Sequence, residues 1–108
     1  MRGIVQAALL AAVVLLPGAA QAQLSPAEQR GLVFVRTHCA SCHSISRIGP
    51  SPLAIAPPFR TLHQRYPVEN LTESLAEGIV TGHATMPEFR LDPDQIGDVI
   101  AFLKSLER

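Results

Sequence analysis

The sequence predicts a small all-α domain, and three observations carry that prediction. Three segments place apolar residues at the three- and four-residue spacing of one helix face. Each segment begins with residues that are typical of a helix N-terminus. No segment shows the period-two alternation of apolar and polar residues that marks a half-buried strand. We therefore expect three to four helices, joined by a long irregular segment between residues 44 and 69.

Residues 1–22 have the composition of a secretory signal peptide. Arg2 supplies a positive start, a nearly unbroken apolar run follows, and residues 20–22 form a small-x-small cleavage site. Cleavage after Ala22 would leave residues 23–108 as the mature domain. The alternative is a retained membrane anchor, but the run is shorter than the span of about 20 residues that a bilayer requires. We expect a periplasmic protein with no stable membrane insertion after cleavage.

The first helix is expected to begin after Ser25, whose hydroxyl can accept from the amides of the first turn. Pro26 suits the first helical position, and Glu28 completes a capping box. The inward face then runs up to two cysteines and consists of Leu32, Phe34 and Val35.

The second helix is expected to begin near Asn70, with Glu73 as its third-position partner, and to end at Gly82. Its apolar face consists of Leu71, Leu75 and Ile79. The segment before it contains five prolines, with a short helix expected around residues 59–65. A loop of this length in a compact domain needs something to wrap around.

The third helix is expected to begin at Asp92, followed by Pro93 and by Gln95 as the third-position partner. Its apolar stripe consists of Ile96, Val99, Ile100 and Leu103, flanked by Phe102 and Leu106.

The charges balance over the whole chain, at nine basic and nine acidic residues, which argues against a nucleic-acid binder. They are unevenly distributed, since residues 23–66 hold five arginines and one glutamate. Residues 67–108 hold three basic and eight acidic residues. The arginines of residues 23–66 have two possible roles, which are the steering of an acidic partner and pairing with the carboxylates of a bound cofactor. The arginines concerned are Arg36, Arg47, Arg60 and Arg65.

The chemistry is carried by the pentapeptide at residues 39–43, Cys-Ala-Ser-Cys-His. C-x-x-C-H is the attachment signature of a c-type haem. Cys39 and Cys42 lie on one side of a single helical turn, so each sulfur can form a thioether with one haem vinyl group. His43 is then delivered to the iron as an axial ligand. A domain of this size also benefits from the stability that a large cofactor supplies.

Two other interpretations of the cysteines were weighed. A thioredoxin-like pair would follow a strand and open a helix, whereas this pair follows a helix. Half of a zinc site would need further ligands, but the remaining histidines, His38, His63 and His83, have no familiar zinc spacing.

Met86 is the candidate for the second axial ligand. It is the only methionine after residue 22 and lies in a loop, Thr85-Met86-Pro87. A thioether favours ferrous iron and raises the reduction potential. The alternatives are His83 or His63 as the ligand, or a methionine that merely fills a gap in the core.

With these elements in order, the chain resembles a class I c-type cytochrome over essentially all of residues 23–108. The resemblance rests on residues 39–43, on Gly31 and Val35 in the first helix, and on Val99 and Phe102 in the last. It implies a cytochrome c fold wrapped around one covalently attached haem. The small glycine would let the first and last helices cross closely.

The resemblance also extends to residues 56–59, Ala-Pro-Pro-Phe, which are similar to the Gly-Pro-x-Leu segment of the family. It implies that the Pro57 carbonyl accepts a hydrogen bond from the His43 ring, although Gly49-Pro50 is a second candidate for this role. The chain departs from mitochondrial relatives because Lys104 is its only lysine. A docking ring of lysines is therefore absent.

The function that the resemblance implies is single-electron transfer by a monomeric, non-enzymatic monohaem protein, with His43 and Met86 on the iron and redox proteins as partners. Two alternatives stay open. If Met86 does not bind the iron, a haem-based sensor or a peroxidase-like protein becomes possible. The chain could also be a dedicated cytochrome subunit of a dehydrogenase.

Overall fold

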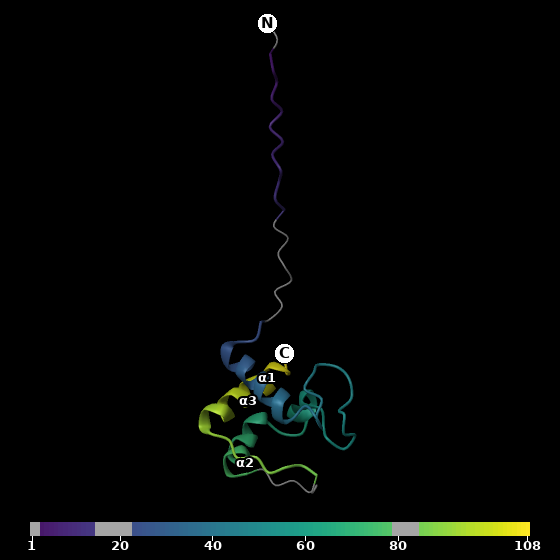
Figure 1. Cartoon of the computed structure of the whole chain (residues 1–108), viewed down its shortest axis with the longest axis vertical. Coiled ribbons are helices and arrows are strands. Elements are labelled where there is room, and N and C mark those ends of the chain that lie inside the picture. The colour runs from purple at the N-terminus through teal and green to yellow at the C-terminus, as the bar shows by residue number, and fades with distance from the viewer. Residues whose placement is uncertain (1–2, 15–22, 79–84) are drawn as a thin grey trace.

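The computed structural model describes residues 3–14, 23–78 and 85–108. Residues 3–14 form an extended, fully exposed trace apart from the helices (Figure 1). The expected cleavage site and its Ala22 lie outside the described residues, so the division at residue 22 stays a prediction. Among the described residues, no helix has the length and apolar character needed to cross a membrane.

The described part of the domain is helical and contains no strand, as the sequence predicted. In chain order, its elements are α1 (Pro26–His38), a 3-10 helix η1 (Phe59–Gln64), a 3-10 turn η2 (Val68–Asn70), α2 (Leu71–Glu77) and α3 (Pro93–Ser105). The short helix expected after the proline-rich loop is η1.

The starts of α1 and α3 follow the sequence prediction. Ser25 Oγ accepts the Glu28 amide at 3.2 Å, and Pro26 occupies the first position of α1. At α3, a capping box joins Asp92 to Gln95, whose Oε1 accepts the Asp92 amide at 3.1 Å. Both contacts use amides that a helix cannot satisfy internally, so they fix where each helix begins.

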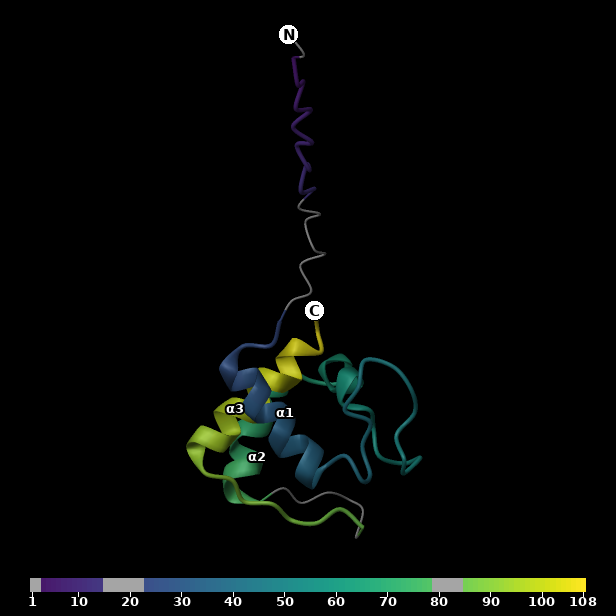
Figure 2. The same ribbon diagram turned by 45° about the horizontal axis from the view of Figure 1, so that its top comes forward.

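The helices α1 and α3 cross face to face, and Gly31 sets how closely they approach (Figure 2). A Cβ built at position 31 would overlap the carbonyl of Asp98 and the Cβ of Phe102. Val35, on the same face of α1, is completely buried. The core around this crossing is formed by Val35, Leu62, Val68, Leu91, Ile96, Val99, Phe102 and Leu103.

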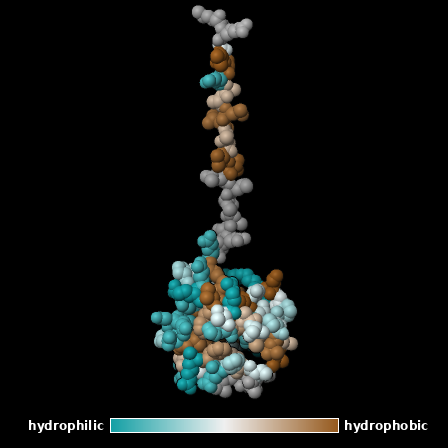
Figure 3. Space-filling model, viewed as in Figure 1, coloured by the Kyte–Doolittle hydropathy of each residue, from teal (hydrophilic) through white to brown (hydrophobic). Residues whose placement is uncertain are grey.

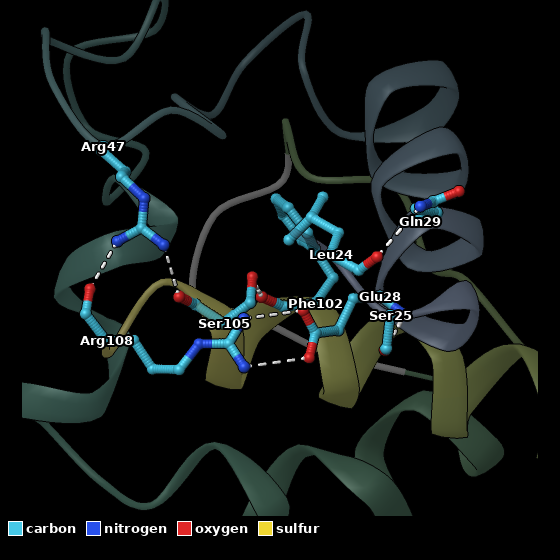
Figure 4. A network of polar contacts seen from close by, with 8 residues as sticks. All are labelled: Leu24, Ser25, Glu28, Gln29, Arg47, Phe102, Ser105 and Arg108. Atoms are coloured by element: carbon cyan, nitrogen blue, oxygen red, sulfur yellow. Dashed lines mark hydrogen bonds and ion pairs between the residues drawn. The ribbon is translucent and has the colours of Figure 1, made fainter. Parts of the chain in front are cut away.

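Charged side chains hold the end of α3 against α1 and the proline-rich loop (Figure 4). Arg108 donates two hydrogen bonds to the Glu28 carboxylate, at 3.2 and 2.8 Å. Arg47, from the loop, donates to the main-chain oxygens of Arg108 at 2.6 Å and Ser105 at 2.7 Å. Because the last carbonyls of a helix lack internal partners, the Arg47 guanidinium completes the C-terminus of α3.

Helix α2 is shorter than the sequence predicted, and its start differs. The Asn70 side chain forms no capping bond, since residue 70 already belongs to the turn η2. The expected end at Gly82 is wrong: the helix ends at Glu77, because Gly78 adopts φ +106°, a conformation that favours glycine. Ile79 and Gly82 lie outside the described residues.

We expect Gly31→Ala to destabilise the holoprotein by about 3 kcal/mol, because the added methyl group overlaps backbone atoms of α3. The matched control is Gly97→Ala, where a Cβ meets nothing within 4 Å. The control should be neutral or stabilise by up to about 1 kcal/mol, as alanine is the better helix former. Urea unfolding followed by circular dichroism measures both, and equal stabilities of the two variants would contradict the close crossing.

The Glu28–Arg108 pair predicts a pH-dependent contribution to stability. The hydrogen bond from Arg108 lowers the pKa of the Glu28 carboxyl. A lowered acid pKa contributes stability above the unfolded-state pKa, and that contribution is lost as the pH falls through the folded-state pKa. Glu28→Gln should therefore unfold at lower urea than the wild type at pH 7, and the gap should close in acid.

The control for this measurement is Glu77→Gln, since Glu77 forms no ion pair within the described residues. A stability gap for Glu28→Gln that is the same at neutral and acidic pH would rule out the ionic origin.

Candidate functional site

The candidate site begins where α1 ends. The Cys39 and Ala40 amides both donate to the Val35 carbonyl, at 2.8 and 2.9 Å. The His43 amide then donates to the Cys39 carbonyl at 2.9 Å, which closes one further turn. This turn places Cys39, Cys42 and His43 along the wall of one cavity.

The His43 ring is held from two sides. Its Nδ1 lies 2.8 Å from the Pro57 carbonyl oxygen, and its ring centroid lies 4.7 Å from that of Phe59. A carbonyl oxygen can only accept, so Nδ1 carries the proton and donates it. The lone pair on Nε2 is therefore left free to bind a metal ion. Of the two carbonyls that the sequence offered, it is Pro57 and not Pro50 that contacts this ring.

Ser44, the residue after His43, aligns the Pro57 segment with the ring. Its carbonyl accepts the Phe59 amide at 2.9 Å, and its own amide donates to Ser51 Oγ at 2.9 Å. Arg60 donates to Ser44 Oγ at 3.3 Å. These three hydrogen bonds hold the two arms of the loop together, and they set the position of the Pro57 carbonyl.

The cavity has a volume of about 370 Å³. Most of its lining is apolar and comes from every helix of the domain as well as from the loop. The apolar lining includes Phe34, Val35, Leu53, Ile55, Phe59, Leu62, Leu71, Leu75, Phe89, Leu91, Val99 and Leu103. A cavity of this kind, with two thiols and two imidazoles in its wall, suits a large apolar cofactor that carries a metal ion.

Met86 lines the same cavity, as do Thr85 and Pro87, and Met86 is half-buried while its two neighbours are exposed. Among its rivals, His63 is exposed on η1 and is not part of the lining. His83 lies outside the described residues. The structure thus brings Met86, His43 and both cysteines to one cavity.

The thiols of Cys39 and Cys42 are free. Burial, and secondarily the neighbouring Cys42, raise the pKa of the Cys39 thiol to about 11. Catalytic and redox-active cysteines instead have a lowered pKa, so the site does not suit thiol–disulfide exchange. Within the described part of the chain, no three side chains of the types His, Cys, Asp and Glu are arranged so that they could hold a metal ion by themselves.

Two cavity residues, Tyr66 and His38, were not expected from the sequence, whereas Arg65 was one of four arginines that could pair with the carboxylates of a cofactor. Arg65 and Tyr66, at the end of η1, add a cation and a hydroxyl to an otherwise apolar lining. His38 lies between two aromatic rings, with centroid distances of 4.5 Å to Phe34 and 6.0 Å to Phe89. The sequence indicated Arg65 only through its charge. For His38, the position directly before Cys39 was the feature that could have indicated a place in the cavity wall.

Comparison with family models gives one match, to the family described as Cytochrome c, over residues 28–107. Neither the curated proteins nor the solved structures gave a match.

Proposed function

Because the chain belongs to the cytochrome c family, whose cofactor is a covalently attached haem c, we propose that it carries single electrons between redox proteins in the periplasm. In this proposal, Cys39 and Cys42 form the two thioethers, and His43 and Met86 bind the iron. The all-α fold is that of the family.

The observation that carries the proposal is the hydrogen bond from His43 Nδ1 to the Pro57 carbonyl at 2.8 Å. A metal-bound histidine commonly donates its other ring nitrogen to a carbonyl, which fixes the ring and increases its basicity. The Ser44 contacts hold the loop that provides this carbonyl, so the chain's own hydrogen bonds set the orientation of the ring.

The haem iron, when bound, supplies a reversible change between the ferric and ferrous states. The chain's own residues determine how that change proceeds. In this proposal, His43 and Met86 would both bind the iron, which would leave it no free position for a substrate, and the largely apolar lining would limit the access of water. A role as an electron carrier rather than an enzyme follows from this arrangement.

Arg65 and Tyr66 are suited to the carboxylates of the haem. Within the described lining, Arg65 is the only side chain with a permanent positive charge, and the Tyr66 hydroxyl can donate a hydrogen bond. An arginine beside a carboxylate in an apolar setting forms a charge-assisted hydrogen bond. In this proposal, Arg65 is the member of the group Arg36, Arg47, Arg60 and Arg65 that pairs with the cofactor.

The location rests on the first 22 residues, whose composition is that of a signal peptide. Haem attachment to a C-x-x-C-H motif takes place on the exported side of the membrane, so the leader and the motif support each other. We propose that the mature chain begins after Ala22 and acts as a monomer.

Met86→Ala should remove the weak far-red band that arises from sulfur-to-iron charge transfer in the oxidised holoprotein. It should also lower the reduction potential, since a soft thioether favours ferrous iron. His63→Ala is the control and should leave the spectrum unchanged, because His63 is exposed and away from the cavity. A Met86→Ala spectrum identical to that of the wild type would exclude this ligand. A wild type that binds carbon monoxide readily would favour a sensor or peroxidase-like protein and would redirect attention to His83.

The double variant Cys39→Ser, Cys42→Ser should release its haem into acidified acetone, because no thioether remains, whereas the wild type should retain its haem. The pyridine haemochrome spectrum measures the same change, since each thioether replaces one vinyl group. Each single variant should keep one thioether. Complete release from either single variant would contradict attachment through both cysteines.

A further inference from the structure

The loop at residues 44–56 exposes apolar side chains at the surface. Three large apolar side chains are strongly exposed in the described part of the helical domain, and two of them belong to this loop. Ile48 is 82% exposed and Ile55 is 55% exposed, whereas Val33 lies on α1 at 59%. In Figure 3, apolar atoms reach the surface at the edge that this loop occupies in Figure 1.

Hydrogen bonds hold the loop in one shape. The Leu53 amide donates to the Cys42 carbonyl at 3.0 Å, and the Ala56 amide donates to the Leu53 carbonyl at 2.9 Å. Arg47 ties the other arm of the loop to the end of α3. The two isoleucines are therefore presented by an ordered backbone, which lowers the entropy cost of binding a partner.

The loop is also continuous with the cofactor cavity. Leu53, Ile55 and Ala56 line the cavity. A partner seated on this loop would therefore lie against the wall of the haem site. This location favours a redox protein as the partner, rather than a surface to which the loop would merely anchor the domain.

The charges around the loop decide the chemistry of the partner. Residues 29–68 contain five arginines and no acidic residue. Arg30 is paired with Asp98 at 3.0 Å, but the other four form no ion pair within the described residues. Arg60 donates to the Ser46 carbonyl at 3.4 Å, a neutral acceptor, so its guanidinium group keeps its net charge. Arg47 instead uses its guanidinium group to hold main-chain oxygens at the end of α3.

We propose that the 44–56 loop, which carries Ile48 and Ile55 and is contacted on its backbone by Arg60, is the docking surface for an acidic redox protein with an apolar contact area. The inference rests on the proposed electron-transfer function, because it names where the partner of that function binds. The apolar side chains supply the buried contact, and the arginines attract the negative partner.

The test uses the oxidised holoprotein and oxidised flavodoxin, an acidic electron-transfer protein, as the probe. With both proteins oxidised, no electron moves, and amide chemical shifts report binding alone. Ile48→Asp should weaken the dissociation constant at least about tenfold, because it removes an apolar contact and adds a repelling charge. Val33→Asp, with the same charge change at an exposed apolar residue on α1, should change it by less than about twofold. Ile48→Leu should keep wild-type affinity.

Salt provides the second measurement. Raising the ionic strength from about 0.01 M to about 0.3 M should weaken binding severalfold, since exposed charges are screened over this range. Equal effects of Ile48→Asp and Val33→Asp, or binding that salt does not change, would overturn the proposal. Binding to phosphatidylglycerol vesicles that depends on Ile48, with no binding of flavodoxin, would reassign the surface to an anionic membrane.

The outcomes separate docking from the proposed function. A holoprotein whose loop binds flavodoxin but whose spectrum lacks methionine ligation retains the docking surface and loses the proposed axial ligand. A holoprotein that shows normal methionine ligation but binds flavodoxin independently of the loop retains the proposed axial ligand and loses the docking surface.

Discussion

The contact between α1 and α3 at Gly31 is the constraint on which the rest of the structure depends. With no side chain at this position, the backbone of α1 lies directly against the Asp98 carbonyl. This contact buries Val35 completely and brings Phe102 and Leu103 into the core. Since α1 runs directly into the turn that carries Cys39, Cys42 and His43, the angle of the helix crossing also sets where these side chains enter the cavity.

Polar contacts then fasten the irregular part of the chain to this helical frame. The proline-rich loop has little regular structure, so its stability depends on specific hydrogen bonds rather than on a ladder. Arg47 joins it to the end of α3, and Ser44 joins its two arms beside His43. The ion pair between Arg108 and Glu28 closes the same region from the side of α1. The Pro57 carbonyl is thereby presented to the His43 ring by a loop that is held at several points.

The cavity shows how a small domain can gain stability and function from the same surface. Its walls include core residues of the domain, such as Leu62, Leu91 and Leu103, which also face a space suited to a large apolar cofactor. Burial also suppresses ionisation of the Cys39 thiol, whose pKa is raised to about 11. The same environment that excludes water from a redox centre thus makes the thiol a poor redox group itself. In the described lining, polarity is concentrated in a few positions, with Arg65 as the permanent cation.

The sequence by itself determined the helical class, the starts of α1 and α3 and the motif at residues 39–43, and it named Met86 as a candidate ligand. These are encoded in short stretches, because capping, helical spacing and a C-x-x-C-H pattern depend on neighbouring residues. Tertiary structure alone decided that α2 ends at Glu77, that the Pro57 carbonyl faces His43 in place of Pro50, and that Arg65 and His38 line the cavity. Each of these features depends on which distant segments of the chain pack together. The local sequence pattern does not specify this packing, which is set by the contact of α1 with α3.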